Sequence, residues 1–464
     1  MSISIKFLGG TRTVTGSSHL VLTDKSEVLI DAGLFQGHRD AFYEVNTTFN
    51  FNPHTIDALI LSHAHIDHCG NIPTLVKRGL RCKIYTTSAT RDLSKLMLMD
   101  SGKIQEEDIR YINKINKKLD LPLRKPLYTA KDAIKAAKRF RAISYGQKFC
   151  VTKDIFVTLY DAGHILGSAI IVLDIKQKDN DIRLGYAVDL GRKSLPIIKD
   201  PVAPKELDYL ILETTYAGRF HPSIEEAKGK LKEAINRTVG RNGKILIPAF
   251  SLERTQEVLY FLNELLKEKA IPTIAVYVDS PLALDVTEVF KTHASYMNAK
   301  TNLAIEGGHS PFEFLNLRFV RSQEESKSLN NNKRPMIILA GSGMCESGRI
   351  LHHLKNNIED SRNTVLVVGY MAQDTLGKRI VEKMRYVRIF GVEYELNAEV
   401  VVINAFSGHA DQNDLCDFIS ACLPLKRIFL VHGDLDQAQN LSNRLITQNL
   451  NIYIPSKGEE ILLN

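Results

Sequence analysis

The sequence has no apolar stretch long enough to cross a membrane, and it has few cysteines. No window holds the roughly 20 uninterrupted apolar residues of a membrane helix, and the first ten residues, MSISIKFLGG, lack the basic and apolar regions of a secretion signal. The six cysteines form no CxxC pair, and a disulfide framework is not expected in so long a chain. We therefore expect buried thiols, no membrane partner and a cytoplasmic location.

Nothing in the composition indicates disorder or a fibrous protein. Hydrophobic residues make up 44% of the 464 residues and charged residues 24%, as in ordinary globular proteins, and we find no internal repeat. At roughly 100–200 residues per domain, this length favours two or three domains over one.

Positive charge is concentrated in one segment. The formal net charge of the chain is +7, with 60 Lys and Arg against 53 Asp and Glu. Residues 113–141, the basic block, contain ten basic and two acidic side chains, so this block alone exceeds the net charge of the whole chain. It is either a docking surface for a polyanion or a solvated helical face, and the sequence leaves both open.

Short strands are expected in the first part of the chain, interrupted by a charged helical region. The helical region covers residues 90–141. The expected strands are apolar runs bounded by turn residues, at 3–8, 19–22, 28–31, 58–61, 155–160, 169–175 and 184–188.

After about residue 205, apolar strands alternate with amphipathic helices, which predicts a mostly parallel sheet covered by helices. One helix is expected from Ser223 to Val239, where Ser223 and Glu226 form a capping-box pair, and another from Glu253 to Lys267. The polar stretch Ser322–Arg334 is expected to be a solvated loop. The strands of this region are expected at 210–212, 245–247, 275–278, 336–339 and 364–368, and the chain ends with strands at 400–403 and 427–431 and helices near 411–421 and 437–448.

The densest group of potential metal ligands is Ser62-His63-Ala64-His65-Ile66-Asp67-His68, directly after a predicted strand. Neutral imidazole and carboxylate are ligands that zinc and related ions accept. A catalytic ion needs only about three protein ligands, so four clustered donors with further donors elsewhere indicate two ions. His164 and Asp189 also stand at strand ends and are plausible additional ligands.

Seven motifs in order resemble the metallo-β-lactamase superfamily and, within it, the β-CASP group of nucleic-acid-cleaving enzymes, which includes the endonuclease of messenger-RNA 3′-end cleavage. The first four motifs are Asp31, His63–His68, His164 and Asp189. The β-CASP motifs A, B and C are matched by Leu212-Glu213-Thr214-Thr215-Tyr216, Ser407-Gly408-His409-Ala410-Asp411 and Val431-His432-Gly433.

The resemblance implies an α/β fold in which a metallo-β-lactamase αββα sandwich carries an inserted β-CASP domain, a mostly parallel sheet flanked by helices. Residues 1–208 and 396–464 would form the first domain, and residues 209–395 the second. His63, His65 and His164 would hold one Zn²⁺, and Asp67, His68 and His432 a second. Asp189 would bridge the two ions, while Asp31 would orient a ligand through hydrogen bonds.

The resemblance also implies roles in catalysis and substrate binding. Asp67, Glu213 and His409 would be catalytic, with His409, held by Glu213, protonating the departing 3′ oxygen. The loop Ala340-Gly341-Ser342-Gly343-Met344 matches a family loop whose amides can cradle an anion, so Ser342 and Gly343 would bind substrate together with Ser407 and His409.

The function implied is a zinc-dependent ribonuclease that uses a hydroxide activated by two metals on single-stranded RNA. RNA is favoured over DNA because motif C has a histidine, His432, where the DNA-repair branch typically has valine. The alternatives are a small-molecule hydrolase such as a thioesterase, and a non-catalytic RNA-binding homologue, which would have lost ligands. Dimers are common in the family, so a homodimer is one expected state. The sequence does not decide between endonuclease and exonuclease action. It also does not identify the native RNA or show whether the basic block contacts RNA.

Overall fold

The computed structural model describes residues 3–37, 39–176, 181–403 and 406–464. The chain folds into two compact units. The first comprises Met1–Ser194, Lys199–Phe220 and Gly408–Asn464, and the second comprises Leu195–Ile198 and His221–Ser407. The domain boundaries after residues 208 and 395 stay a prediction. None of the helices described is long and apolar enough to cross a membrane.

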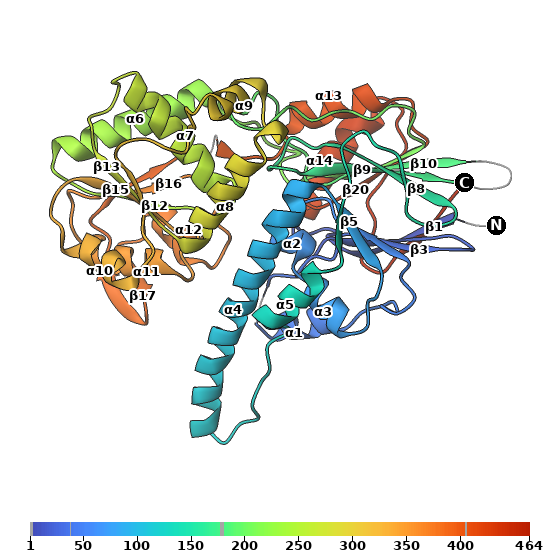
Figure 1. Ribbon diagram of the computed structural model, residues 1–464, viewed down its shortest axis with the longest axis horizontal. Coiled ribbons are helices and arrows are strands. Elements are labelled where there is room, and N and C mark those ends of the chain that lie inside the picture. The colour runs from blue at the N-terminus through green and yellow to red at the C-terminus, as the bar shows by residue number, and fades with distance from the viewer. Residues whose placement is uncertain (1–2, 38, 177–180, 404–405) are drawn as a thin grey trace. The chain divides into compact units, whose positions relative to one another are not determined.

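The first unit contains two sheets of seven strands each (Figure 1). One sheet has the order β22 (Glu460–Leu463), β1 (Ile3–Gly9), β2 (Ser18–Leu22), β3 (Glu27–Ile30), β4 (Ala58–Ile60), β5 (Lys83–Thr86) and β6 (Phe140–Ala142). The other has the order β21 (Ile452–Tyr453), β20 (Arg427–Val431), β11 (Tyr209–Glu213), β10 (Ile182–Ala187), β9 (Ala169–Ile175), β8 (Ile155–Asp161) and β7 (Phe149–Cys150).

The two sheets face each other across one apolar core, and helices cover their outer faces. Alternate residues of both sheets, such as Ile5, Ile30, Ile171 and Phe429, bury their side chains in this central core. The outer face of the first sheet packs on α2 (Ile66–Cys69), α3 (Ile72–Lys77), α4 (Ser88–Lys118) and α5 (Ala130–Ala137), with α1 (Arg39–Thr47) nearby. The outer face of the second packs on α13 (Gln412–Cys422) and α14 (Leu435–Ile446). This layering is the predicted αββα sandwich.

The carboxyl ends of strands from both sheets meet at one edge of the sandwich. β3 and β4 are parallel, as are β10, β11 and β20, and β8 runs in the same direction as β10 because both pair antiparallel with β9. Loops that follow parallel strands therefore converge, which is where α/β proteins commonly place their sites.

The second unit is built on a six-stranded sheet in which each strand runs parallel to its neighbours. Its order is β14 (Leu317–Phe319), β13 (Ala275–Asp279), β15 (Met336–Ala340), β12 (Ile245–Pro248), β16 (Thr364–Val367) and β19 (Glu399–Val402). A separate hairpin is formed by β17 (Tyr386–Ile389) and β18 (Val392–Glu395).

Helices lie on both sides of this sheet: α6 and α7 on one side and α10 and α11 on the other (Figure 1). The helical segments of the unit are α6 (Ile224–Gly240), α7 (Arg254–Lys267), α8 (Pro281–Thr292), the 3-10 turn η1 (Ala294–Tyr296), α9 (Ala299–Glu306), α10 (Gln323–Asn331), α11 (Arg349–Asn357) and α12 (Leu376–Val381). The predicted parallel sheet covered by helices is confirmed.

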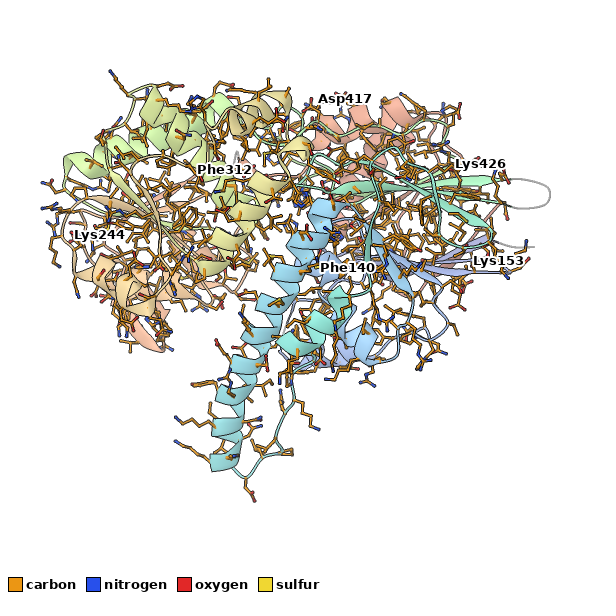
Figure 2. The ribbon with its side chains drawn as sticks, viewed as in Figure 1. Phe140, Lys153, Lys244, Phe312, Asp417 and Lys426 are labelled. Carbon is orange, nitrogen blue, oxygen red and sulfur yellow. The ribbon has the colours of Figure 1, made fainter. Side chains whose placement is uncertain are left out.

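The prediction of a loop at Ser322–Arg334 was wrong, because most of this stretch forms α10. The hydroxyl of Ser322 accepts a hydrogen bond from the Glu325 amide and caps the helix, and Leu329 is buried. At the other end, the buried ammonium of Lys244 (labelled in Figure 2) donates to the carbonyls of Leu329 and Asn330 at 3.0 and 3.1 Å. Tertiary contacts thus stabilise a helix that its polar composition did not indicate.

Two further expectations need correction. Residues 90–141 form two helices, α4 and α5, joined by a non-helical segment, and strand β6 follows. The six cysteines are not uniformly buried: Cys69, Cys345 and Cys422 are, but Cys150 is exposed. Of the two hydrogen bonds of the capping box expected at α6, the structure has the one in which the Ser223 hydroxyl accepts from the Glu226 amide.

Candidate metal centre

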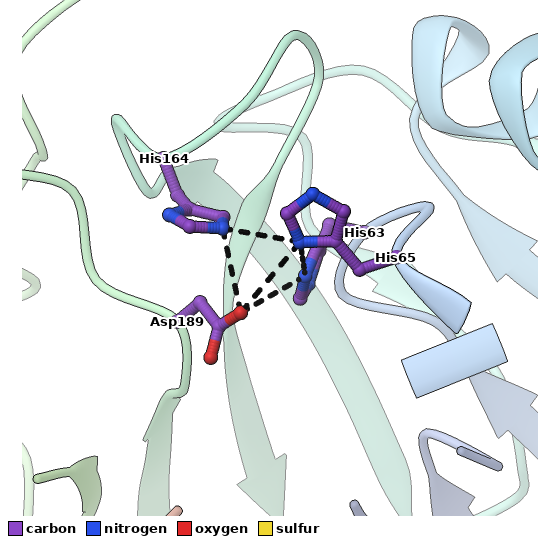
Figure 3. Close-up of side chains that lie close together, drawn as sticks. All are labelled: His63, His65, His164 and Asp189. Atoms are coloured by element: carbon purple, nitrogen blue, oxygen red, sulfur yellow. Dashed lines mark hydrogen bonds and ion pairs between the residues drawn. The ribbon is translucent and has the colours of Figure 1, made fainter. Parts of the chain in front are cut away.

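Three imidazoles and one carboxylate from three loops point toward a common centre in the first unit (Figure 3). His63 and His65 follow β4, His164 follows β8, and Asp189 follows β10. The Nδ1 atom of His65 lies 3.1 Å from Nε2 of His63 and 3.2 Å from Nε2 of His164. A tetrahedral zinc ion with Zn–N bonds of 2.0–2.1 Å requires donor separations of about 3.3 Å. These four residues, the first cluster, could therefore hold one ion.

A second cluster consists of Asp67, His68 and His432. Helix α2 carries the first two residues, and His432 follows β20. The Nε2 atoms of the two histidines are 3.2 Å apart, and Oδ2 of Asp67 lies 3.5 Å from Nε2 of His432. Both histidines are buried, whereas the Asp67 side chain is 25% exposed. The second cluster thus offers a mixed nitrogen and oxygen donor set that opens toward solvent at its carboxylate.

Asp189 lies between the two clusters. Its Oδ2 is 3.2 Å from Nε2 of His63 and 3.4 Å from Nε2 of His164. Its Oδ1 is 3.0 Å from Nδ1 of His432 and 3.6 Å from Nε2 of His68. The Asp189 side chain is buried, at 2% exposure. One carboxylate oxygen therefore faces each cluster, as a bridging ligand would.

Glycine at position 191 allows two of the ligand-bearing loops to touch. A Cβ atom at Gly191 would lie 1.7 Å from the carbonyl oxygen of Gly163, so no larger residue fits. The Gly191 amide donates to the carbonyl of Ala162 at 2.8 Å. This contact holds the loop of His164 against the loop of Asp189.

Asp31 lies behind the second cluster and orients His68. Its Oδ2 lies 2.7 Å from Nδ1 of His68 and accepts hydrogen bonds from the hydroxyls of Ser62 (2.7 Å) and Tyr186 (2.8 Å). Its Oδ1 accepts from the Ser62 amide at 2.8 Å. With Nδ1 of His68 engaged, Nε2 is directed to the cluster. Asp31 has a φ of 57°, a costly conformation for a residue other than glycine, which these contacts maintain.

Glu213 and His409 form a pair beside the first cluster. Both carboxylate oxygens of Glu213 lie 3.2 Å from Nδ1 of His409. The amides of Leu190 and Thr215 donate to the same carboxylate, which is fully buried. The imidazole of His409 is 21% exposed, and its ring centre lies 4.6 Å from that of His164. The buried Glu213 thus fixes an imidazole at the edge of the site.

The charges of the site favour a cation in the second cluster. Burial lowers the pKa of His63 to about 4, which keeps its imidazole neutral. Burial also opposes protonation of His432, but the carboxylates of Asp189 and Asp67 raise its pKa to about 10. The pKa of Asp67 is held below its ordinary value by His432 and His68, although burial alone would raise it. Negative charge therefore outweighs burial around the second cluster, as expected of a cation site.

The predicted substrate-binding residues Ser342, Gly343 and Ser407 belong to the second unit. The hydroxyl of Ser342 accepts hydrogen bonds from the amides of Glu346 and Ser347 at 3.1 and 3.2 Å, so it closes its own loop. Gly343 and Ser407 are buried. Their contact with substrate stays a prediction.

Three residues that support the site were missed from the sequence. Ser62 and Tyr186 bond to Asp31, and the Thr215 hydroxyl donates to the carbonyl of His432 at 3.1 Å. Ser62 directly precedes the histidine motif, which is a signal that could have been used. Tyr186 carries no such signal, because its hydroxyl meets Asp31 only across the two sheets.

Three family models match the chain in succession. Residues 20–194 match the metallo-beta-lactamase superfamily domain, residues 255–380 the Beta-Casp domain, and residues 393–455 the Zn-dependent metallo-hydrolase RNA specificity domain.

Relatives match over nearly the whole chain. "Ribonuclease TTHA0252" from Thermus thermophilus is 34% identical over 98% of this chain and 98% of its own length. "Transcription termination factor FttA" is 32% identical in Methanosarcina mazei, over 93% of this chain and 67% of that protein, and 32% identical in Pyrococcus horikoshii, over 96% and 68%. A solved protein of unknown function from Enterococcus faecalis shares the fold, with a TM-score of 0.58, 14% identity and full coverage of both chains. The chain therefore belongs to the β-CASP group of the metallo-β-lactamase superfamily.

Proposed function

We propose that the first unit holds two zinc ions per chain and that the protein hydrolyses phosphodiester bonds of single-stranded RNA. The protein is a metal-dependent nuclease that acts on RNA, in keeping with the ribonuclease among its relatives and the RNA specificity domain matched at residues 393–455. The position of Asp189, with one oxygen toward each cluster, carries the two-ion proposal.

The donor chemistry fits zinc. The first cluster supplies three imidazoles and the second supplies two imidazoles and a carboxylate, which are preferred zinc ligands. The spacing of the imidazole nitrogens, 3.1–3.2 Å, is close to what one tetrahedral ion requires. The burial of the Asp189 carboxylate also favours a cation there, since a buried carboxylate needs a positively charged partner.

Bound zinc ions lower the pKa of water and offset negative charge on phosphate oxygens. The protein's own residues supply the rest. Asp31 holds His68 in one orientation, and Glu213 does the same for His409. Because Nδ1 of His409 faces Glu213, we assign Nε2 to donate a proton to the departing 3′ oxygen. Asp67 is the most exposed residue of the second cluster, so we assign its carboxylate to contact the water that reacts.

The experiment that tests this function offers two substrates to the zinc-loaded protein. We expect labelled single-stranded RNA to be cut and a thioester to remain intact. Hydrolysis of the thioester without cleavage of RNA would favour a small-molecule hydrolase instead. RNA binding without cleavage, in a protein that holds two zinc ions, would indicate a non-catalytic homologue. Labels at the 5′ and 3′ ends of the RNA would also separate internal cutting from trimming.

A further inference from the structure

A cavity of about 250 Å³ lies in the first unit, outside the two metal clusters. Its walls come from the loop between β1 and β2, from residues 32–35 after β3, from helix α1 and from residues 48–51. A single ordered water needs only about 10–15 Å³ by a comparable measure, and an engineered apolar cavity of about 150 Å³ binds benzene. The cavity is therefore large enough for a small flat ligand.

Two buried polar atoms in the lining lack partners among the described residues: Oγ1 of Thr11 and Oδ1 of Asn71. The side chains of Thr11 and Asn71 are only 7% and 6% exposed, so solvent does not readily satisfy them. A buried polar group without a hydrogen bond costs about 1–3 kcal/mol, so such groups usually indicate an absent partner.

The orientation of the Asn71 amide is fixed by its neighbour Asn46. Oδ1 of Asn46 accepts from the Phe35 amide at 2.8 Å, and its Nδ2 donates to the carbonyls of Phe35 and Phe42. Oδ1 of Asn46 is thus an acceptor, and Nδ2 of Asn71 donates to it at 3.2 Å. Asn71 therefore presents its carbonyl oxygen as the unsatisfied atom, which needs a hydrogen-bond donor. Glu44, which is exposed, also belongs to the residues that line the cavity.

Aromatic rings complete the lining. Phe35, Phe49 and Phe51 all contribute, and the last two rings lie 5.7 Å apart in a tilted arrangement. The ammonium of Lys457 lies 5.9 Å from the centre of the Phe35 ring. Flat rings beside hydrogen-bond acceptors suit a planar heterocycle that carries an amino group, because bases stack on aromatic side chains and donate from their exocyclic amines.

We propose that this cavity binds a nucleobase with an exocyclic amino group, adenine or cytosine, with Oδ1 of Asn71 as the acceptor for the amine and the Thr11 hydroxyl as a second hydrogen-bond partner of the base. The cavity is built on the same scaffold as the metal clusters. The Ser17 amide donates to the carbonyl of Asp67 at 2.9 Å, and the Gly10 carbonyl accepts from the His432 amide at 2.6 Å. The site is nevertheless separate from the metal centre, and base binding does not depend on the proposed cleavage.

The test uses nucleosides, which have no phosphate for the metal clusters to bind. Adenosine and inosine differ at position 6, where an amine is replaced by a carbonyl, and cytidine and uridine differ likewise at position 4. By calorimetric titration of the zinc-loaded protein, adenosine and cytidine should bind at least about tenfold more tightly than inosine and uridine. Equal affinity within both pairs, or no binding of any nucleoside, would overturn the proposal and leave a cavity filled by water.

Two variants locate the site. Thr11→Val removes the unsatisfied hydroxyl at nearly constant volume and should weaken adenosine binding about fivefold. Thr48→Trp, a change at an exposed lining residue, should abolish binding by filling the cavity. Thr55→Val, outside the cavity, is the control and should bind like the wild type. Unchanged binding by Thr48→Trp would contradict the location, even if Thr11→Val failed to fold.

RNA cleavage by the Thr48→Trp variant then shows whether the bound base belongs to an RNA strand or to a free nucleoside. If the cavity holds a base of the RNA strand, Thr48→Trp should raise KM for oligocytidylate but not for oligouridylate. If it holds a free nucleoside, both KM values should stay unchanged while nucleoside binding is abolished. Both results support the site. Failure of all RNA cleavage would count against the proposed function and not against nucleoside binding.

Discussion

His68 is held from two sides, which makes it the most informative single ligand to remove. Its Nδ1 faces Asp31, its Nε2 lies 3.2 Å from that of His432, and its side chain is fully buried. The residue types of the HxHxDH motif were predicted as ligands because so few side chains bind zinc. The support given by Ser62 and Tyr186 could not be predicted, because it depends on how two sheets meet.

His68→Ala should lower the zinc content of the purified protein and abolish RNA cleavage, since the second cluster would keep only two of its three donors. Zinc is measured by atomic emission on protein of known concentration. His54→Ala, at an exposed histidine of the same unit, is the matched control and should keep full zinc content. Wild-type zinc stoichiometry in His68→Ala would remove this residue from the ligand set.

His409→Ala tests proton transfer separately from metal binding. The variant should keep both zinc ions, because His409 belongs to neither cluster, and should cut RNA about 10²-fold more slowly. Single-turnover cleavage rates check the expected decrease, and His309→Ala at an exposed position serves as control. Wild-type turnover by the variant would show that His409 is not the general acid.

Asp161, at the end of β8, should make stability depend on pH. Burial raises its pKa to about 7. The hydrogen bond from the Gly163 amide and the positive charge of Lys199 lower the pKa by less than burial raises it. A folded pKa above the unfolded value means that the folded state holds the proton more tightly, so stability falls as pH rises from about 4 to about 7. The slope is at most about 1.4 kcal/mol per pH unit for one proton.

Asp161→Asn should remove this slope. Between pH 5 and pH 7 the free energy of unfolding of the wild type should therefore fall relative to that of the variant. Urea unfolding with a chelator present measures the difference without a contribution from zinc. Asp154→Asn is the control. Hydrogen bonds from Ser26 and Thr23 lower the pKa of Asp154 although burial would raise it, so its contribution is constant in this pH range. If the free energies of unfolding of Asp161→Asn and the wild type differed by the same amount at pH 5 and pH 7, the Asp161 carboxyl would not be neutral in the folded state.

At the scale of elements, the strands expected from apolar runs bounded by turns lie where they were predicted. Strand β9, for example, has the predicted bounds. Several short strands were not predicted, among them β5, β6, β7 and the hairpin of β17 and β18. Helix α10 was missed because its sequence is almost entirely polar, and it is held by a capping serine, one buried leucine and the ammonium of Lys244. The sequence does not indicate such long-range capping, since Lys244 lies about 85 positions away.

The basic block forms the end of α4, the connecting segment, α5 and the start of β6. Nine of its ten basic side chains are exposed, and only Arg139 is partly covered. The last buried residue of α4 is Ile109, so the rest of this helix has no core of its own. The block therefore exposes a concentrated positive charge, as a polyanion-binding surface would.

Neutralising Lys131 and Lys135 on α5 and Lys138 at its C-terminal end should weaken RNA binding and flatten its salt dependence. Each phosphate that the variant no longer neutralises lowers the slope of log K against log salt by about 0.7 for a single strand. Fluorescence anisotropy at several salt concentrations measures the slope. Neutralising Lys300, Lys327 and Lys333 in the second unit is a charge-matched control. An unchanged slope in the α5 variant would show that the block is only a solvated helical face.

For the whole molecule, the alternation of strands and helices after residue 205 predicted the parallel sheet, and the motifs predicted the sandwich. The residues of the two metal clusters come from positions up to 369 apart in the sequence, from His63 to His432. Their convergence followed from the resemblance to a family and not from local patterns. The nucleobase cavity was not predicted at all, because an unfilled space between side chains leaves no trace in residue periodicity.

Two zinc ions at the paired clusters are proposed to make this chain a ribonuclease. The most direct measurement is to strip the metal with a chelator, titrate zinc back and follow RNA cleavage at each step. Cleavage should be absent without metal and should rise to a plateau at two zinc ions per chain. Cleavage by the metal-free protein, or intact RNA at two zinc ions per chain, would contradict a two-zinc ribonuclease.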